Sequence, residues 1–112
     1  MKEQFKLGFG FSGVYNASRT IALAKRAEQI SLDSVWIAED YFQGGAFSIA
    51  SACAVNTSTI KIGIGVINPY TRHPSLIAME AVSLDEISGG RMIIAMGASN
   101  KRWIELQEGI PY

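Results

Sequence analysis

Residues Gly63–Gly97, GIGVINPYTRHPSLIAMEAVSLDEISGGRMIIAMG, carry the clearest structural pattern in this chain. They predict a strand over 60–67, a polar loop, a helix over 74–87 and, after the Gly89–Gly90 turn, a strand over 92–96. Pro74 suits the first turn of that helix. The strands are continuous apolar runs, which favours a parallel sheet covered by helices. Because ligands bind at the carboxyl ends of strands in βα folds, the polar loop predicts a site.

Strand and helix patterns alternate along the rest of the chain as well. Ser18 is the predicted N-cap of the first helix. Four βα units in a row fit either a doubly wound sheet or half of a (β/α)8 barrel, and periodicity alone does not choose between them. The other predicted strands are Leu7–Phe11 and Ser34–Ala38, and the other predicted helices are Ser18–Ile30, Ala46–Val55 and Lys101–Gln107.

The composition indicates one globular domain. The chain has 112 residues, of which 48% are apolar, and its 10 basic side chains balance 10 acidic ones. That balance argues against a nucleic-acid-binding protein, which needs a basic excess. The single cysteine, Cys53, excludes an intramolecular disulfide. Neither a signal-peptide pattern nor an apolar run of membrane-spanning length is visible, so we expect a cytoplasmic protein that binds no membrane.

Two adjacent carboxylates, Glu39 and Asp40, follow the second predicted strand. One of them could have a raised pKa and act as a catalytic proton donor or acceptor. The alternative is that one carboxylate caps the following turn and the other is solvated. Successive strand residues point to opposite faces, so the two cannot face the same ligand if the strand continues through them.

Two loops hold the other residues that could bind a ligand at this site. Asn68, Thr71 and Asn100 offer hydrogen bonds, and the rigid guanidinium fork of Arg72 suits a phosphate or carboxylate. His73 is as well placed for a structural hydrogen bond at the start of the third helix as for catalysis. No set of His, Cys and carboxylate residues has metal-ligand spacing, so we expect no metal.

Gly63 and Gly65 lie inside the third predicted strand. Glycines there indicate either a bulge with a ligand close to the backbone or a plain strand whose glycines allow close packing. We favour the bulge. The tryptophans, Trp36 and Trp103, are interpreted as core residues.

Charged residues around the third helix are predicted to pair with one another. Glu80 lies on the apolar stripe of that helix, so its carboxylate is expected either to have a charged partner or to lie at an interface. Arg91 follows the glycine turn and is expected to pair with Asp85 and Glu86.

The motif NPYTRHP at 68–74, the helix end LDEISGGR at 84–91 and the earlier DSVWIAEDYF at 33–42 form one ordered set. Together they resemble the bacterial luciferase-like superfamily of flavin- and deazaflavin-dependent oxidoreductases, and within it the coenzyme F420-dependent methylene-tetrahydromethanopterin reductases. The resemblance runs from about Phe5 to Gly97 and implies a (β/α)8 TIM barrel of ~250 residues or more. We therefore expect residues 1–112 to be the N-terminal half of such a barrel, about four parallel βα units of a longer protein.

The resemblance also implies a cofactor site. In the family a non-prolyl cis peptide in a strand bulge backs the flavin-type ring, and the match falls on Gly65–Val66. The implied cofactor is coenzyme F420, with FMN as the alternative, and Arg72 would meet the polyglutamate tail or phosphodiester of F420. The implied cofactor-binding residues are Gly65, Val66, Asn68, Thr71, Arg72 and Asn100.

The catalytic residues of relatives carry over only in part. Where the family often has Asp-His, this chain has Glu39–Asp40, so these carboxylates are the candidate catalytic residues and no histidine acid/base is implied. Asn100 stands near a glutamate that donates a proton in the sugar-phosphate branch of the family. Because an asparagine cannot transfer a proton at neutral pH, Asn100 argues against that branch.

The resemblance implies hydride transfer between F420, or FMN, and a small organic substrate, by a homodimer that packs through helices of this half. The alternative is a non-catalytic, truncated half-barrel that dimerises or binds a flavin. Further βα units encoded beyond Tyr112 would favour the enzyme, whereas a stop codon there would favour the module.

Overall fold

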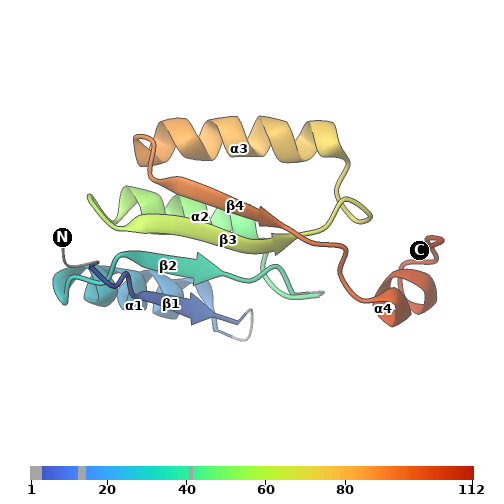
Figure 1. The fold of residues 1–112 in the computed structure, drawn as a ribbon, viewed down its shortest axis with the longest axis horizontal. Coiled ribbons are helices and arrows are strands. Elements are labelled where there is room, and N and C mark those ends of the chain that lie inside the picture. The colour runs from blue at the N-terminus through green and yellow to red at the C-terminus, as the bar shows by residue number, and fades with distance from the viewer. Residues whose placement is uncertain (1–3, 13–14, 41) are drawn as a thin grey trace.

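The computed structural model describes residues 4–12, 15–40 and 42–112, so Tyr41 of the DSVWIAEDYF motif lies outside the described residues. Strands and helices alternate along the described ranges (Figure 1). No helix within these ranges combines the length and the apolar character needed to cross a membrane. The elements are β1 (Gly8–Phe11), α1 (Ala17–Gln29), β2 (Ser34–Ile37), α2 (Ala46–Val55), β3 (Lys61–Ile67), α3 (Pro74–Ser88), β4 (Met92–Met96) and α4 (Lys101–Leu106).

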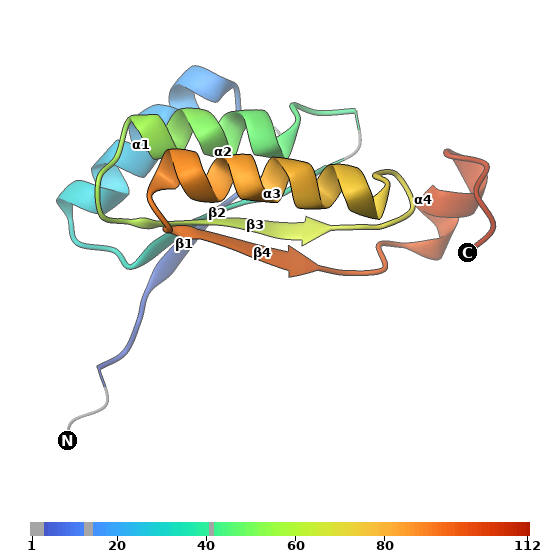
Figure 2. The same cartoon turned by 90° about the horizontal axis from the view of Figure 1, so that it is seen from above.

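The strands form one parallel sheet in the order β1-β2-β3-β4. Figure 2 shows that α1, α2 and α3 all cover the same face of this sheet, whereas α4 lies beyond the carboxyl end of β4. A doubly wound sheet reverses its strand order and carries helices on both faces. Sequential strands with helices on one face are the arrangement of a βα barrel. The predicted barrel half is therefore confirmed.

The predicted boundaries are confirmed to within one residue, but the predicted N-cap of α1 is wrong. Asn16, not Ser18, caps this helix, and its side-chain oxygen accepts a hydrogen bond from the backbone N–H of Arg19 at 2.9 Å. Asparagine and serine cap helices about equally well. The helix begins earlier than the apolar periodicity suggests, which places Ser18 inside its first turn.

The core fills the space between the sheet and the helices. Val35 and Ile37 of β2 and Ile62 and Ile64 of β3 are buried there, together with Cys53 of α2. Burial along β2 alternates, because successive strand residues point to opposite faces. The residues between these apolar side chains therefore face the side of the sheet that the helices leave uncovered.

Arg91 does not pair with Asp85 or Glu86, so this prediction is wrong. Its guanidinium instead donates to the backbone carbonyls of Ala54 at 2.8 Å and Ile60 at 2.9 Å. The last carbonyls of a helix lack partners within the helix. Arg91 supplies such partners at the end of α2, and it ties that end to the start of β3.

The expected irregularity in β3 is present. The pairing of β3 with β4 shifts register between Gly65 and Ile67, which marks a bulge, and the Gly65–Val66 peptide bond is cis. Both features confirm the prediction made for this pair of residues. The bulge lies close to the carboxyl end of the sheet, where the loops converge.

Candidate functional site

An open cleft of about 550 Å³ lies at the carboxyl ends of the strands. This volume is within the range of small-molecule sites. Its walls come from the loop after β2, from the bulge in β3 and from the segment joining β4 to α4. The cleft brings together the predicted site residues Glu39, Asp40, Gly65, Val66 and Asn100.

Both candidate catalytic carboxylates reach the cleft because β2 ends at Ile37, before them. Glu39 also has structural partners: its Oε2 accepts from Nε of Arg72 at 2.6 Å and its Oε1 accepts from Nη2 at 2.7 Å. The same Oε1 accepts from the backbone N–H of Ala46 at 3.3 Å, at the start of α2, where a negative charge is favourable. Asp40 is exposed on the cleft wall.

Arg72 is engaged by carboxylates of its own chain. Besides the two-pronged contact with Glu39, its Nη1 donates to Oε2 of Glu80 at 2.9 Å, which confirms that Glu80 is paired. The hydrogen bonds that Arg72 donates to Glu39 raise the pKa of Arg72, so the guanidinium stays protonated. Its Cζ atom lies 5.3 Å from the ring centre of Phe47. The fork of Arg72 therefore joins the loop after β2 to α3, and Arg72 is not among the residues that line the cleft.

Asn68 and Thr71 hold the loop between β3 and α3 in shape. Asn68 is buried, and its Oδ1 accepts from the backbone N–H groups of Tyr70 and Thr71 at 3.0 Å each and from the Thr71 hydroxyl at 3.1 Å. This is an Asx turn. His73 is the N-cap of α3, where its Nδ1 accepts from the backbone N–H of Ser75 at 3.2 Å. These contacts favour the structural reading of His73.

Asn100 is the N-cap of α4, and its Oδ1 accepts from the backbone N–H of Arg102 at 2.9 Å. Ser99, Trp103 and Gln43 line the cleft beside it, and none of them was among the predicted site residues. The interpretation of Trp103 as a core residue is wrong, because 37% of it is exposed. Its position in the first turn of a helix that follows a strand end is the signal that could have identified it.

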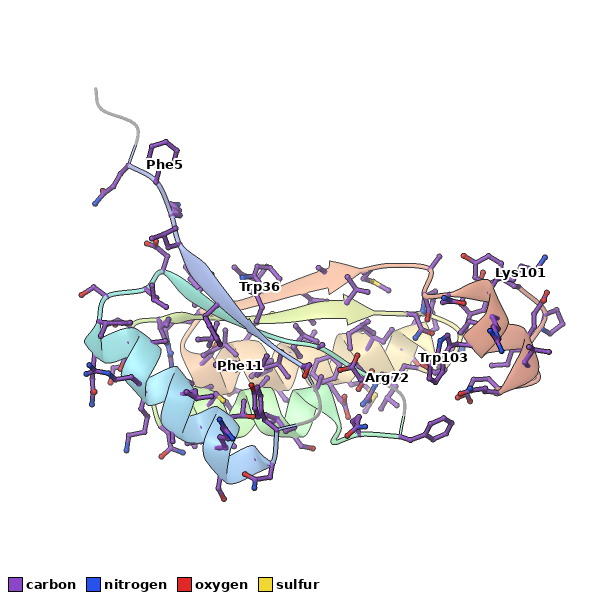
Figure 3. All side chains as sticks on the ribbon, turned by 90° about the horizontal axis from the view of Figure 1, so that it is seen from below. Phe5, Phe11, Trp36, Arg72, Lys101 and Trp103 are labelled. Carbon is purple, nitrogen blue, oxygen red and sulfur yellow. The ribbon has the colours of Figure 1, made fainter. Side chains whose placement is uncertain are left out.

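Trp36 is half-buried on the sheet face away from the helices, opposite Phe11, which points toward them (Figure 3). A Cβ atom added to Gly63 would lie 2.5 Å from the indole ring, and one added to Gly65 would lie 3.1 Å from it. The close approach that the two glycines predict is therefore made, in this structure, by the side chain of Trp36.

Comparison with known proteins agrees with this architecture. Residues 8–112 match the model of the luciferase-like monooxygenase family. The 5,10-methylenetetrahydromethanopterin reductase of Methanolobus tindarius is 47% identical over 66% of this chain and 23% of its own length. The enzyme of the same name from Methanopyrus kandleri is 41% identical over 80% of this chain and 26% of its own length.

A solved structure is similar over nearly the whole chain. The coenzyme F420-dependent tetrahydromethanopterin reductase from Methanopyrus kandleri superposes with a TM-score of 0.88 and 35% identity, covering 97% of this chain and 31% of that one. The chain thus spans about a quarter of the length of the curated relatives it matches. The family match takes in every strand and helix of the described residues. The chain belongs to the luciferase-like monooxygenase family.

Proposed function

We propose that the full-length protein is an oxidoreductase that transfers a hydride between coenzyme F420 and a small organic substrate, in the manner of a methylenetetrahydromethanopterin reductase. The observation that carries this proposal is the cleft at Gly65–Val66, in a chain that is 35% identical to a reductase described as coenzyme F420-dependent. FMN is the alternative cofactor, since the superfamily resemblance extends to flavin-dependent enzymes.

The residues of the cleft suit a flat ring system. Gly65 has no side chain, and Val66 is 46% exposed, so together they present a low, apolar surface. Asp40, Ser99 and Asn100 add polar groups around it. Binding sites for small molecules combine such an apolar surface with a few polar groups that fix the orientation of the ligand.

Each residue of the site has a proposed task. Gly65 and Val66 would support one face of the ring, and Asn100 would orient its polar edge. Asp40 would hold or accept a proton at its carboxylate. When bound, F420 supplies the carbon that donates or accepts the hydride, while the protein contributes binding, orientation and exclusion of water.

The other predicted site residues are proposed to hold the loops around the cleft in place, Glu39 from within the cleft wall and the others from behind it. Glu39 and Arg72 join the loop after β2 to α3, and Asn68 with Thr71 holds the loop after β3 in its Asx turn. These contacts support a positioning role, because the first fixes the loop that carries Asp40 and Gln43 and the second fixes the loop that follows the bulge at Gly65 and Val66.

The test is a fluorescence titration of the full-length protein with F420 and, separately, with FMN. We expect F420 to bind and FMN to bind more weakly. An Asn100→Leu variant should weaken F420 binding, while Lys61→Ala, at the opposite end of β3, should leave it unchanged. Tight binding of FMN with none of F420 would overturn the choice of cofactor. Failure of both would reject the enzyme and favour the non-catalytic module.

We also propose that the protein is a homodimer that packs through α2 and α3. A groove of about 370 Å³ runs between these helices, lined by residues that include Phe47, Leu76 and Met79. Met79 and Val82 are 66% and 68% exposed, which is a large apolar surface for one helix. Met79→Lys, in the groove, should shift the full-length protein toward monomer in sedimentation analysis, whereas Gln29→Lys on α1 should not. A monomeric wild-type protein would contradict this proposal.

A further inference from the structure

Trp36 crosses the uncovered face of the sheet from β2 toward β3. Its indole N–H donates to Oγ of Ser34 at 3.0 Å, which fixes one end of the ring near the start of β2. The other end, atoms Cε3 and Cζ3, lies against Gly65. The indole ring therefore spans from the amino end of β2 to the glycine that lines the cleft.

The indole ring and its anchor lie so close to Gly63 and Gly8 that neither position can carry a side chain without a shift of Trp36 or Ser34. A Cβ atom on Gly63 would lie 2.5 Å from Cδ2 and Cε3 of the indole, and one on Gly8 would lie 2.4 Å from Oγ of Ser34. Real Cβ contacts are not found at such distances, so a side chain at either position would displace Trp36 or its anchor. Gly10 lies on the same strand as Gly8, yet a Cβ there would meet nothing within 4 Å.

We propose that Trp36 is a positioning residue of the cofactor cleft. Its indole, held by the hydrogen bond to Ser34 and packed on Gly63, supports Gly65 and so fixes the position of the cleft floor, the surface formed by Gly65 and Val66. The inference rests on the proposed function, because it assigns Trp36 a role in holding the surface against which F420 binds. Trp36 itself is not among the residues lining the cleft, so it acts through Gly65.

Gly65 is packed between the indole and the cleft. A change that moves the ring by a few tenths of an ångström should therefore also displace Gly65 in the cleft floor. Small displacements of a ligand-supporting group can cost large factors in binding or rate. Removing the Ser34 hydroxyl frees the ring, whereas adding a methyl group at Gly63 pushes it.

The test compares glycine variants in the full-length protein, with F420 affinity and the emission band of bound F420 as readouts. Gly63→Ala should weaken F420 binding by about tenfold and shift the emission band. The matched control, Gly10→Ala, should bind F420 like the wild type. Exchanging the indole for a smaller ring should make room for the new methyl group, so the double variant Trp36→Phe/Gly63→Ala should bind F420 more tightly than Gly63→Ala alone.

A second variant keeps the proposal testable if Gly63→Ala does not fold. Ser34→Ala adds no bulk and should weaken F420 binding several-fold while its melting temperature stays near that of the wild type. Wild-type affinity in both Gly63→Ala and Ser34→Ala, or no recovery in the double variant, would overturn the role of Trp36. A wild-type protein that binds no F420 would instead overturn the proposed function and this role with it.

Discussion

At the scale of single residues, two glutamates show how differently a carboxylate can be used in this chain. Glu39 shares its oxygens between Arg72 and the start of α2. The carboxylate of Glu28, near the end of α1, accepts hydrogen bonds from the backbone N–H groups of Ser58 at 2.9 Å, Thr59 at 2.7 Å and Ile60 at 2.9 Å. Hydrogen bonds to the ionised form favour that form. Glu28 is therefore a charged tie between α1 and the segment that leads into β3.

The hydrogen bonds from Thr59, Ile60 and Ser58 lower the pKa of Glu28 from 4.5 to about 2. A lowered pKa stabilises the folded state above the ordinary pKa, and this contribution is lost as the pH falls from 4.5 toward 2. Glu28→Gln should lower the free energy of unfolding at pH 7 by about 1–2 kcal/mol, a figure reduced for solvent screening. Urea unfolding at neutral and acidic pH measures it.

The control for this prediction is Glu86→Gln, at an exposed position on α3. Its free energy of unfolding should stay close to that of the wild type at every pH. If Glu28→Gln unfolds like the wild type at neutral pH, or if the difference between them grows on acidification, the charged tie does not stabilise the fold.

Cys53 is a further residue whose ionisation the fold changes. It is fully buried in α2, and burial raises the pKa of its thiol to about 11. Because the thiolate is the reactive form, Cys53 should resist maleimide in the native full-length protein and react once denaturant is added. Mass spectrometry of the peptide that carries Cys53 distinguishes the two cases. Rapid labelling under native conditions would show that the helix opens readily.

At the scale of elements, the loop between β3 and α3 depends on one buried side chain. The Oδ1 atom of Asn68 accepts three hydrogen bonds from Tyr70 and Thr71. Asn68→Ala leaves these donors without an acceptor and should cost about 1–3 kcal/mol of stability. Asn68→Asp keeps an acceptor oxygen and should cost less. Thermal unfolding of both variants measures the difference, and equal losses would show that the oxygen is not what holds the loop.

The elements were predictable because their signals are local. The Gly89–Gly90 turn marks a helix end, and Gly89 adopts the left-handed conformation there. The partners of Arg91 and Arg72 were not predictable in the same way. Arg91 contacts Ala54, which is distant in sequence, and nothing in the local pattern distinguishes that carbonyl from the nearer Asp85.

The candidate site was predictable to the extent that it follows strand ends. Gly65, Val66 and Asn100 lie at such ends and line the cleft. Asn68 and Arg72 follow a strand end as well, but their side chains are taken up by partners within the chain. Whether a polar side chain points into a cleft or into its own loop depends on tertiary contacts, which residue type and spacing do not specify.

At the scale of the whole molecule, the uncovered face of the sheet is the feature that distinguishes this barrel segment from an ordinary layered α/β domain. Small residues and Trp36 lie on that face, whereas β2 and β3 bury apolar side chains toward the helices. In a closed barrel the inward side chains fill the interior in layers. The indole of Trp36 fills the space that Gly63 and Gly65 leave on this face. Large and small residues alternate in this way in the interiors of small barrels.

The proposed function requires the cleft at Gly65–Val66 to hold the ring of coenzyme F420. A crystal structure of the full-length protein grown with F420 is the direct test. We predict that the ring lies against Gly65 and Val66, with the side chain of Asn100 within hydrogen-bonding distance of its polar edge. A ring bound elsewhere, such as in the groove between α2 and α3, would contradict the assignment.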